Sequence, residues 1–143
     1  ILKFSTPQPL FLNQCKQMNN SNADTNKAIL EKGNAAIQQG NNEGFLAFCT
    51  DDTVWTFVGD KILKGKEAVR QWMKTTYKEP PKFNVANLIA EGDYVTAVGD
   101  ITMKNEKGEE VNYSYCDVWE FRNGLIASLR AFVIESGKEE ENE

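Results

Sequence analysis

The stretch NYSYCDVWEFRNG, residues 112–124, reads as a β-strand with one face that could do chemistry. Alternate side chains of a strand point to opposite sides. One side therefore carries Tyr113, Tyr115, Asp117, Trp119 and Phe121. A carboxyl group among aromatic rings can anchor a ligand, or act as an acid or base if burial raises its pKa. Asp117 is the first candidate site residue if this face lines a cavity.

A second acid, Asp100, lies on the preceding strand-like stretch, residues 94–103. If the turn KNEKGEE joins the two strands through an even loop, even positions before it share a face with odd positions after it. That face would hold Tyr94, Thr96, Val98, Asp100, Thr102, Tyr113, Tyr115, Asp117 and Trp119. Its mixture of aromatic and polar side chains favours a ligand cavity. The alternative is that this face points to solvent.

In this register Asp100 and Asp117 could share a proton and supply an acid and a base near neutral pH. The simpler interpretation is that Asp100 forms a hydrogen bond with Tyr113 or Tyr115. The ligand contacts predicted on this face are Tyr113, Tyr115, Trp119 and Val98. Tyr115 and Trp119 are best suited to stacking on a flat molecule.

Arg130 could pair with Asp117, depending on the turn at RNG. A two-residue turn would pair Arg122 with Leu125 and bring Arg130 opposite Asp117, where it would anchor an anion and keep the acid ionised. A three-residue turn with a bulge would bring Leu129 there and turn Arg130 to the other face. The sequence leaves both alternatives open.

The composition excludes several classes of function. The net charge of −5 argues against a nucleic-acid partner. No apolar run is long enough for a bilayer span, and no basic amphipathic helix indicates membrane association. The chain has no histidine, and its three cysteines show no CxxC spacing. We therefore expect neither a thiol enzyme nor a metal site, and no cofactor; unpaired cysteines are typical of a cytoplasmic protein.

The remaining pattern predicts the elements that position these residues. Apolar spacing predicts helices over 22–41, 42–52 and 65–77, with a strand at 53–59 between the second and third. From Lys82 onward the chain reads as four strands joined by turns. We expect a poorly ordered N-terminal extension over 1–24, one domain over 25–135 and a charged tail over 136–143. Met18 is a candidate translation start, with the upstream residues as an extension.

This order resembles the nuclear transport factor 2-like superfamily, specifically its SnoaL-like branch. The resemblance is carried by FLAFCTDDTVWTFVG, LKGKEAVRQWMK and YCDVWEFRNGLIASLRAFVIE, and covers roughly residues 25 to 135. It implies an α+β fold in which three N-terminal helices pack in a strongly curved antiparallel sheet, the cystatin-like cone, with an internal pocket and frequent homodimers. It also implies that Trp72 forms part of the cavity wall.

The known active sites of the superfamily match this chain only in part. Asp117 matches the protonated aspartate of ketosteroid isomerases, but Thr56 stands where their general base falls and Gly33 where their tyrosine falls. Asp100 matches an acid of limonene epoxide hydrolases, but Val98 replaces their arginine. For SnoaL-type cyclases the resemblance implies a His/Asp acid–base arrangement, and this chain has no histidine.

We therefore expect a homodimeric, cytoplasmic protein that binds a small, mainly apolar molecule, with Asp117 and Asp100 as catalytic candidates. The candidate ligand contacts are Tyr115, Trp119, Tyr113, Val98, Trp72, Thr56 and Arg130. One alternative is an isomerase, cyclase or hydrolase that uses the aspartate pair. The other is a dimeric interaction domain with a vestigial cavity.

Overall fold

The computed structural model describes residues 10–137 and 141, with side chains from residue 22 onward. The helices are α1 (Leu10–Gln38), α2 (Asn42–Leu46) and α3 (Lys66–Thr76). The strands are β1 (Cys49–Phe57), β2 (Lys61–Lys64), β3 (Lys82–Glu91), β4 (Tyr94–Lys104), β5 (Glu110–Arg122) and β6 (Leu125–Glu135). The expected order of three helices and a final four-strand meander is confirmed. The poorly ordered N-terminal extension over 1–24 and the charged tail over 136–143 stay predictions.

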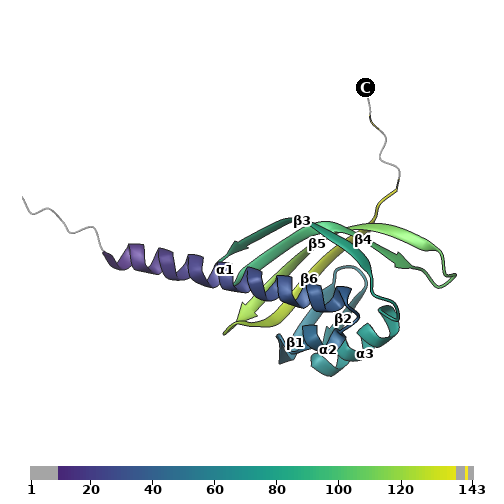
Figure 1. Cartoon of the computed structure of the whole chain (residues 1–143), viewed down its shortest axis with the longest axis horizontal. Coiled ribbons are helices and arrows are strands. Elements are labelled where there is room, and N and C mark those ends of the chain that lie inside the picture. Colours follow the sequence, from purple (N-terminus) through teal and green to yellow (C-terminus); the bar gives the residue numbers. More distant parts are fainter. Residues whose placement is uncertain (1–9, 138–140, 142–143) are drawn as a thin grey trace, which may run out of the picture.

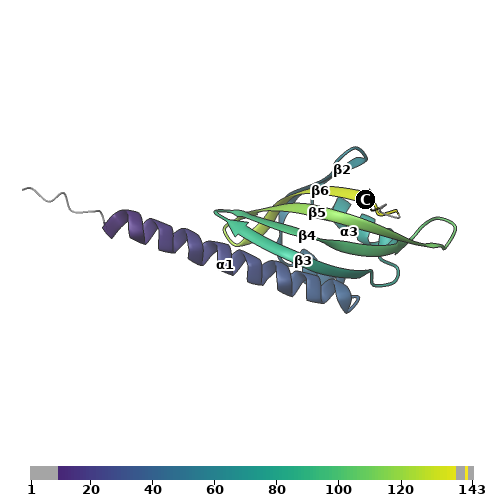
Figure 2. The same ribbon diagram turned by 90° about the horizontal axis from the view of Figure 1, so that it is seen from above.

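All six strands form one sheet in the order β2-β1-β6-β5-β4-β3. The sheet is curved, and the three helices pack on its concave side (Figure 1). This confirms the predicted α+β cone. One detail differs from an antiparallel sheet, because β1 and β6 pair in parallel. Seen from above, α1 runs beside β3 and its first turns extend past the ends of the strands (Figure 2).

Helix α1 packs on the sheet through a stripe at helical spacing. Its buried positions are Ala23, Asn26, Leu30, Gly33 and Ile37. The steps of three and four residues are those of one helix face. Ala28 and Ala35 lie outside this stripe and are exposed. At Gly33 a Cβ atom would meet the ring of Phe45 at 2.8 Å, so only glycine lets α2 approach this closely.

The connection between β4 and β5 decides which of their residues share a face. Lys104 pairs with Glu110, so five residues form the loop. The side-chain oxygen of Asn105 accepts hydrogen bonds from the backbone N–H groups of Lys107 and Glu109, both at 3.0 Å, and Gly108 has a φ of 77°. This loop pairs odd positions with odd positions, including Ala97 with Asp117. The even-loop register predicted from the sequence is therefore wrong.

The turn between β5 and β6 follows neither of the two predicted registers. Arg122 pairs with Leu125 across Asn123 and Gly124, as in the two-residue alternative. A bulge then shifts the pairing between Glu120 and Phe121, so that Ala131 lies opposite Asp117. Arg130 pairs with Val118 and lies on the other face of the sheet, where its guanidinium stacks 5.6 Å from the ring centre of Phe132.

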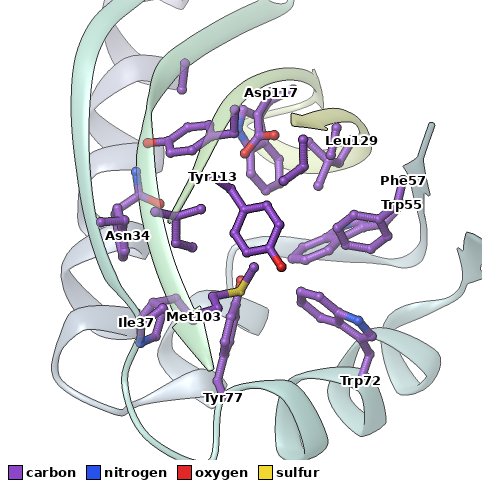
Figure 3. A pocket seen from close by; sticks show the side chains of 18 of the residues that line it. Asn34, Ile37, Trp55, Phe57, Trp72, Tyr77, Met103, Tyr113, Asp117 and Leu129 are labelled. Carbon is purple, nitrogen blue, oxygen red and sulfur yellow. The ribbon is translucent and has the colours of Figure 1, made fainter. Parts of the chain in front are cut away.

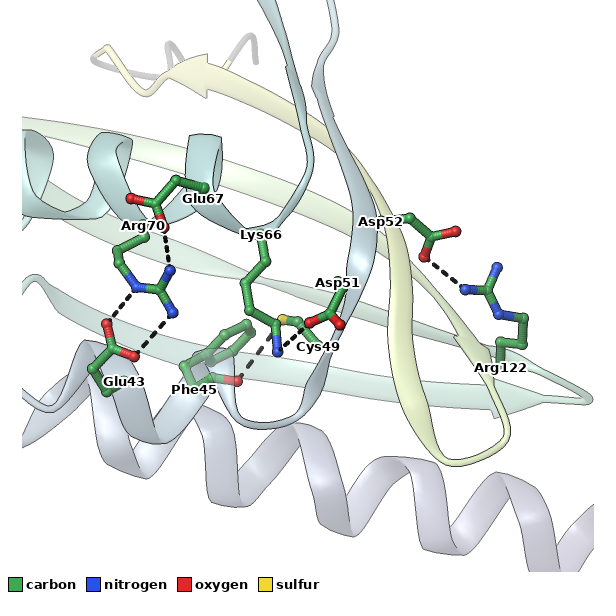
Figure 4. Close-up of polar contacts among 9 residues, drawn as sticks. All are labelled: Glu43, Phe45, Cys49, Asp51, Asp52, Lys66, Glu67, Arg70 and Arg122. Carbon is green, nitrogen blue, oxygen red and sulfur yellow. Dashed lines mark hydrogen bonds and ion pairs between the residues drawn. The ribbon is translucent and has the colours of Figure 1, made fainter.

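Helices α2 and α3 are joined by a charged contact at the surface. The guanidinium of Arg70 in α3 binds Glu43 of α2, with Nε 2.7 Å from Oε1, and also binds Glu67 (Figure 4). These hydrogen bonds raise the pKa of Arg70 and lower that of Glu43, while hydrogen bonds from Gln71 and then Arg70 lower the pKa of Glu67. All three groups therefore stay charged near neutral pH. The contact joins α2 to α3, the helix that carries Trp72.

Candidate ligand-binding cavity

A cavity of about 360 Å³ lies between the concave face of the sheet and the three helices. Its volume falls within the range of about 300–1,000 Å³ typical of small-molecule sites. The sheet contributes Trp55, Phe57, Phe83, Ala97, Ile101, Met103, Tyr113, Tyr115, Asp117, Trp119, Leu129, Ala131 and Val133. The helices and connections contribute Asn34, Ile37, Phe45, Val58, Asp60, Trp72, Tyr77 and Pro81. Most of this surface is apolar and aromatic.

Asp117 is the acid deepest in this lining. It lies in mid-β5 between Ala97 of β4 and Ala131 of β6, two small side chains that leave its carboxyl group room but offer it no hydrogen bond. Among the described residues, no group forms a hydrogen bond with its buried Oδ1. Burial raises the pKa of Asp117 from 3.8 to about 7 because the ionised form loses its hydration. The carboxyl group can therefore either donate or accept a proton near neutral pH.

Tyr115, two residues before Asp117, is held in place by a contact across three strands. Its hydroxyl donates a hydrogen bond to the carbonyl oxygen of Asn84 in β3, at 3.0 Å. The hydroxyl passes over Gly99 of β4, where a Cβ atom would meet the Asn84 oxygen at 2.0 Å and the hydroxyl at 2.7 Å. Burial raises the pKa of Tyr115 to about 12, and Asp117 adds to the shift. Tyr115 therefore stays neutral near pH 7, with its hydroxyl bound to Asn84.

The wall that faces Asp117 is aromatic (Figure 3). Ring centres lie 4.8 Å apart for Phe57 and Trp72, 5.1 Å for Trp72 and Tyr77, and 6.1 Å for Trp55 and Trp72. Tyr113 projects into the space between these rings and Asp117. Burial raises the pKa of Tyr77 far above neutrality, and Asp117 adds to that shift. The Nε1 of Trp55 is buried and finds no acceptor within the described part of the chain.

The structure brings together five of the predicted site residues. Asp117, Tyr113, Tyr115, Trp119 and Trp72 all line the cavity. Sequence alternation placed four of them on one face of β5, and the resemblance placed Trp72. Their roles as catalytic or ligand-binding groups stay predictions.

The other four predicted site residues lie away from this cavity. Val98 and Asp100 are even residues of β4 and face the convex side, because odd residues face Asp117. Ser114 donates a hydrogen bond to the Asp100 carboxylate at 3.0 Å, so the partner is a serine and not the expected tyrosine. Thr56 pairs with Arg130 on this same side. No shared proton between Asp100 and Asp117 is possible in this arrangement.

Sequence reasoning missed several lining residues. Asn34, Ile37, Tyr77, Ala97, Met103 and Ala131 were not among the predicted contacts. The N-x-x-G pattern at 105–108 could have indicated Ala97 and Met103. An asparagine-initiated turn with a left-handed glycine is typical of longer hairpin loops. The five-residue loop found here places these odd residues of β4 on the face of Asp117. No local pattern indicates Tyr77 or Asn34, which reach the cavity through helix packing.

The described residues offer neither a metal-binding cluster nor a membrane-spanning helix. Within residues 22–137 and 141, side chains of Cys, Asp and Glu form no group of three or more that could hold a metal ion. None of the helices in this part of the chain is both long and apolar enough to cross a membrane. Cys49 and Cys116 are free thiols, and burial raises the pKa of Cys49 to about 12.

A curved sheet that encloses an aromatic cavity with helices over its concave face defines a cone-shaped α+β protein of the nuclear transport factor 2-like kind. The family model of the SnoaL-like domain matches residues 30–129. The chain therefore belongs to the SnoaL-like domain family. The curated proteins compared with this chain include no match.

Solved structures share this fold at low sequence identity. Bal32a, from a soil-derived mobile gene cassette, aligns with a TM-score of 0.71 and 21% identity over 78% of this chain and 91% of its own. An LEH-like epoxide hydrolase from M. tuberculosis aligns with a TM-score of 0.70 and 18% identity, over 78% and 84%. An NTF2-like protein from Burkholderia xenovorans LB400 reaches 0.67 and 19%, over 78% and 91%. At these identities the likeness is one of fold.

Proposed function

We propose that this protein binds a small, mainly apolar molecule in the cavity, with Asp117 as the polar contact that orients it. One observation carries the proposal: a buried carboxyl oxygen without a hydrogen-bond partner among the described residues lies in a largely aromatic cavity. Leaving a buried polar group unpaired costs about 1–3 kcal/mol. A ligand that pairs with this oxygen recovers that free energy, while its apolar body contacts the rings.

Filling the cavity tests the proposal. Ala131 lines the cavity opposite Asp117, so Ala131→Leu would place extra methyl groups in the space a ligand needs. We expect N-phenyl-1-naphthylamine, a neutral fluorescent probe, to bind the wild type and to bind this variant at least tenfold more weakly. Ala86→Leu, at an exposed position of β3, is the matched control. Equal binding by a folded Ala131→Leu variant would contradict the proposal.

A second candidate function is acid–base catalysis by Asp117 acting alone. A carboxyl group with a pKa of about 7 is suited to moving a proton at neutral pH. One solved structure with this fold is an LEH-like epoxide hydrolase, and this likeness supports an enzyme as the second candidate. The isomerase, cyclase or hydrolase alternative therefore rests on a single acid, because Asp100 lies on the other face.

Deuterium uptake by a small ketone distinguishes ligand binding from catalysis. In D2O at neutral pD, 2-indanone is an apolar probe whose C–H bonds beside the carbonyl are acidic enough for a carboxylate to remove a proton. Catalysis predicts that the wild type speeds deuterium uptake and that Asp117→Asn does not, as followed by NMR. Equal rates of deuterium uptake with both proteins would contradict catalysis and leave ligand binding as the remaining candidate.

The homodimer stays a proposal, and the convex face of the sheet supports it. Large apolar side chains are exposed there at Ile89, Tyr94, Phe132 and Ile134. Apolar patches of this kind often mark protein–protein contacts. Sedimentation of the wild type beside an Ile134→Lys variant tests it: a dimer that becomes a monomer is expected, whereas a monomeric wild type would overturn it.

A further inference from the structure

The charges that face the cavity are unbalanced. Asp117 and Asp60 are its acidic lining residues, and no lysine or arginine occurs among the described residues that line it. Asp60 lies in the exposed turn between β1 and β2, whereas Asp117 lies deep on β5. A buried carboxylate is normally paired with a cation, because an isolated ion in a medium of low polarity is strongly disfavoured. Here the described protein groups supply no such cation.

The aromatic wall has the composition of a cation-binding cage. Trp55, Phe57, Trp72 and Tyr77 surround the space on the far side from Asp117, and Tyr113 projects into the cavity between these rings and Asp117 (Figure 3). The faces of such rings carry negative potential and attract organic cations, most strongly where water is excluded. Two independent features, the rings and the unpaired carboxyl group, therefore favour the same sign of charge in the ligand.

We propose that the ligand of this cavity is a compact organic cation, an amine or quaternary ammonium with an apolar body, whose charge lies between the aromatic wall and the Asp117 carboxylate. This inference rests on the proposed function and specifies its ligand class. A neutral ligand that accepts a hydrogen bond from protonated Asp117 is the competing class. The two classes differ in how binding depends on pH.

A bound cation would stabilise the ionised form of Asp117 and so lower its pKa from about 7. Cation binding below that pH must then release a proton, and affinity should fall about tenfold for each pH unit below 7. The other titratable groups that line the cavity with Asp117 are the hydroxyls of Tyr77, Tyr113 and Tyr115, and Asp60 lies at the exposed turn. The pKa values of Tyr77 and Tyr115 are raised further from neutrality, so these two phenols stay neutral in this range.

A pair of probes of equal shape tests the inference. Phenyltrimethylammonium carries a fixed positive charge at every pH, and tert-butylbenzene is its neutral isostere. Binding of each is measured by tryptophan fluorescence and NMR titration at pH 5, 6 and 8. We expect the wild type to prefer the cation at least tenfold at pH 8, and to lose this preference progressively toward pH 5.

Two asparagine variants locate the effect. Asp117→Asn should abolish the preference for the cation while binding tert-butylbenzene as the wild type does, which also shows that the cavity is intact. Asp100→Asn makes the same change on the opposite face of the sheet and should behave as the wild type.

Several outcomes would overturn the inference. If tert-butylbenzene binds as tightly as the cation at pH 8, the ligand class is wrong but the cavity still binds small apolar molecules. A preference for the cation that survives in Asp117→Asn would likewise remove the carboxylate from the explanation. Binding of neither probe would contradict both this inference and the proposed function.

Discussion

The two faces of strands β4, β5 and β6 differ sharply although they alternate residue by residue. On the concave face, Ala97, Trp119 and Leu129 are buried and surround a single acid, Asp117. On the convex face, Asp100 and Arg130 are exposed to water and have hydrogen-bond or ring contacts. The same residue type, aspartate, is an ordinary surface group on one side and a proton donor poised near neutral pH on the other. Burial, and not residue identity, makes the difference.

The largest expected effect concerns the pH dependence of stability. The folded-state pKa of Asp117 lies above its unfolded value, so its contribution to stability is fully present below about pH 4 and is lost as pH rises through 7. Relative to Asp117→Asn, the wild type should lose on the order of 4 kcal/mol between pH 4 and pH 8. Urea denaturation of both proteins at the two pH values measures this. Parallel stability curves would show that Asp117 is not buried as described.

The next effect concerns truncation of an aliphatic side chain, which should lower stability more on the concave face than on the convex face. Leu129 is 3% exposed and lines the cavity, whereas Ile134, also in β6, is 70% exposed. We expect Leu129→Ala to lower the free energy of unfolding by about 2–5 kcal/mol and Ile134→Ala by about 0.5 kcal/mol or less, as measured in dilute protein. Similar losses for both would mean that the convex face is covered in solution.

A smaller effect on stability is expected at Gly99, where the Tyr115 hydroxyl passes over β4 to reach Asn84. Gly99→Ala would push a methyl group against the Asn84 carbonyl and the Tyr115 hydroxyl. The strands must shift, and we expect a loss of about 1–3 kcal/mol together with a change in the environment of Tyr115. Gly137→Ala is the matched control, because a Cβ there meets nothing within 4 Å and Gly137, like Gly99, has no positive φ. A variant at Gly99 as stable as the wild type would contradict this close approach.

The smallest effect is expected for the convex acid. Asp100→Asn removes a charge from an exposed residue and keeps an acceptor for the hydroxyl of Ser114. We expect a change in stability within about 0.5 kcal/mol at pH 4 and at pH 8. A pH-dependent effect as large as that of Asp117→Asn would show that the two acids are coupled, contrary to the observed register.

Local pattern predicted much of the fold but only part of the cavity. Alternation along 112–124 was enough to place Tyr113, Tyr115, Asp117 and Trp119 on one face, because this period belongs to a single strand. The register predicted between neighbouring strands was wrong at both turns. A five-residue loop placed odd residues of β4 beside Asp117, and a bulge placed Ala131 opposite it. Each one-residue shift exchanges the faces of a whole strand, so small uncertainties in a turn become large errors in a site.

The sequence by itself determined the α+β class, the SnoaL-like family and the aromatic face of β5, because these follow from residue order and local period. Only the tertiary structure decided that Asp117 stands alone, with Asp100 and Arg130 turned away from it. It also decided that Tyr77 and Asn34 complete the wall, because these residues reach the cavity through packing of segments distant in the chain. The raised pKa of Asp117 belongs to this second group, since loss of hydration depends on everything that folds around the carboxyl group.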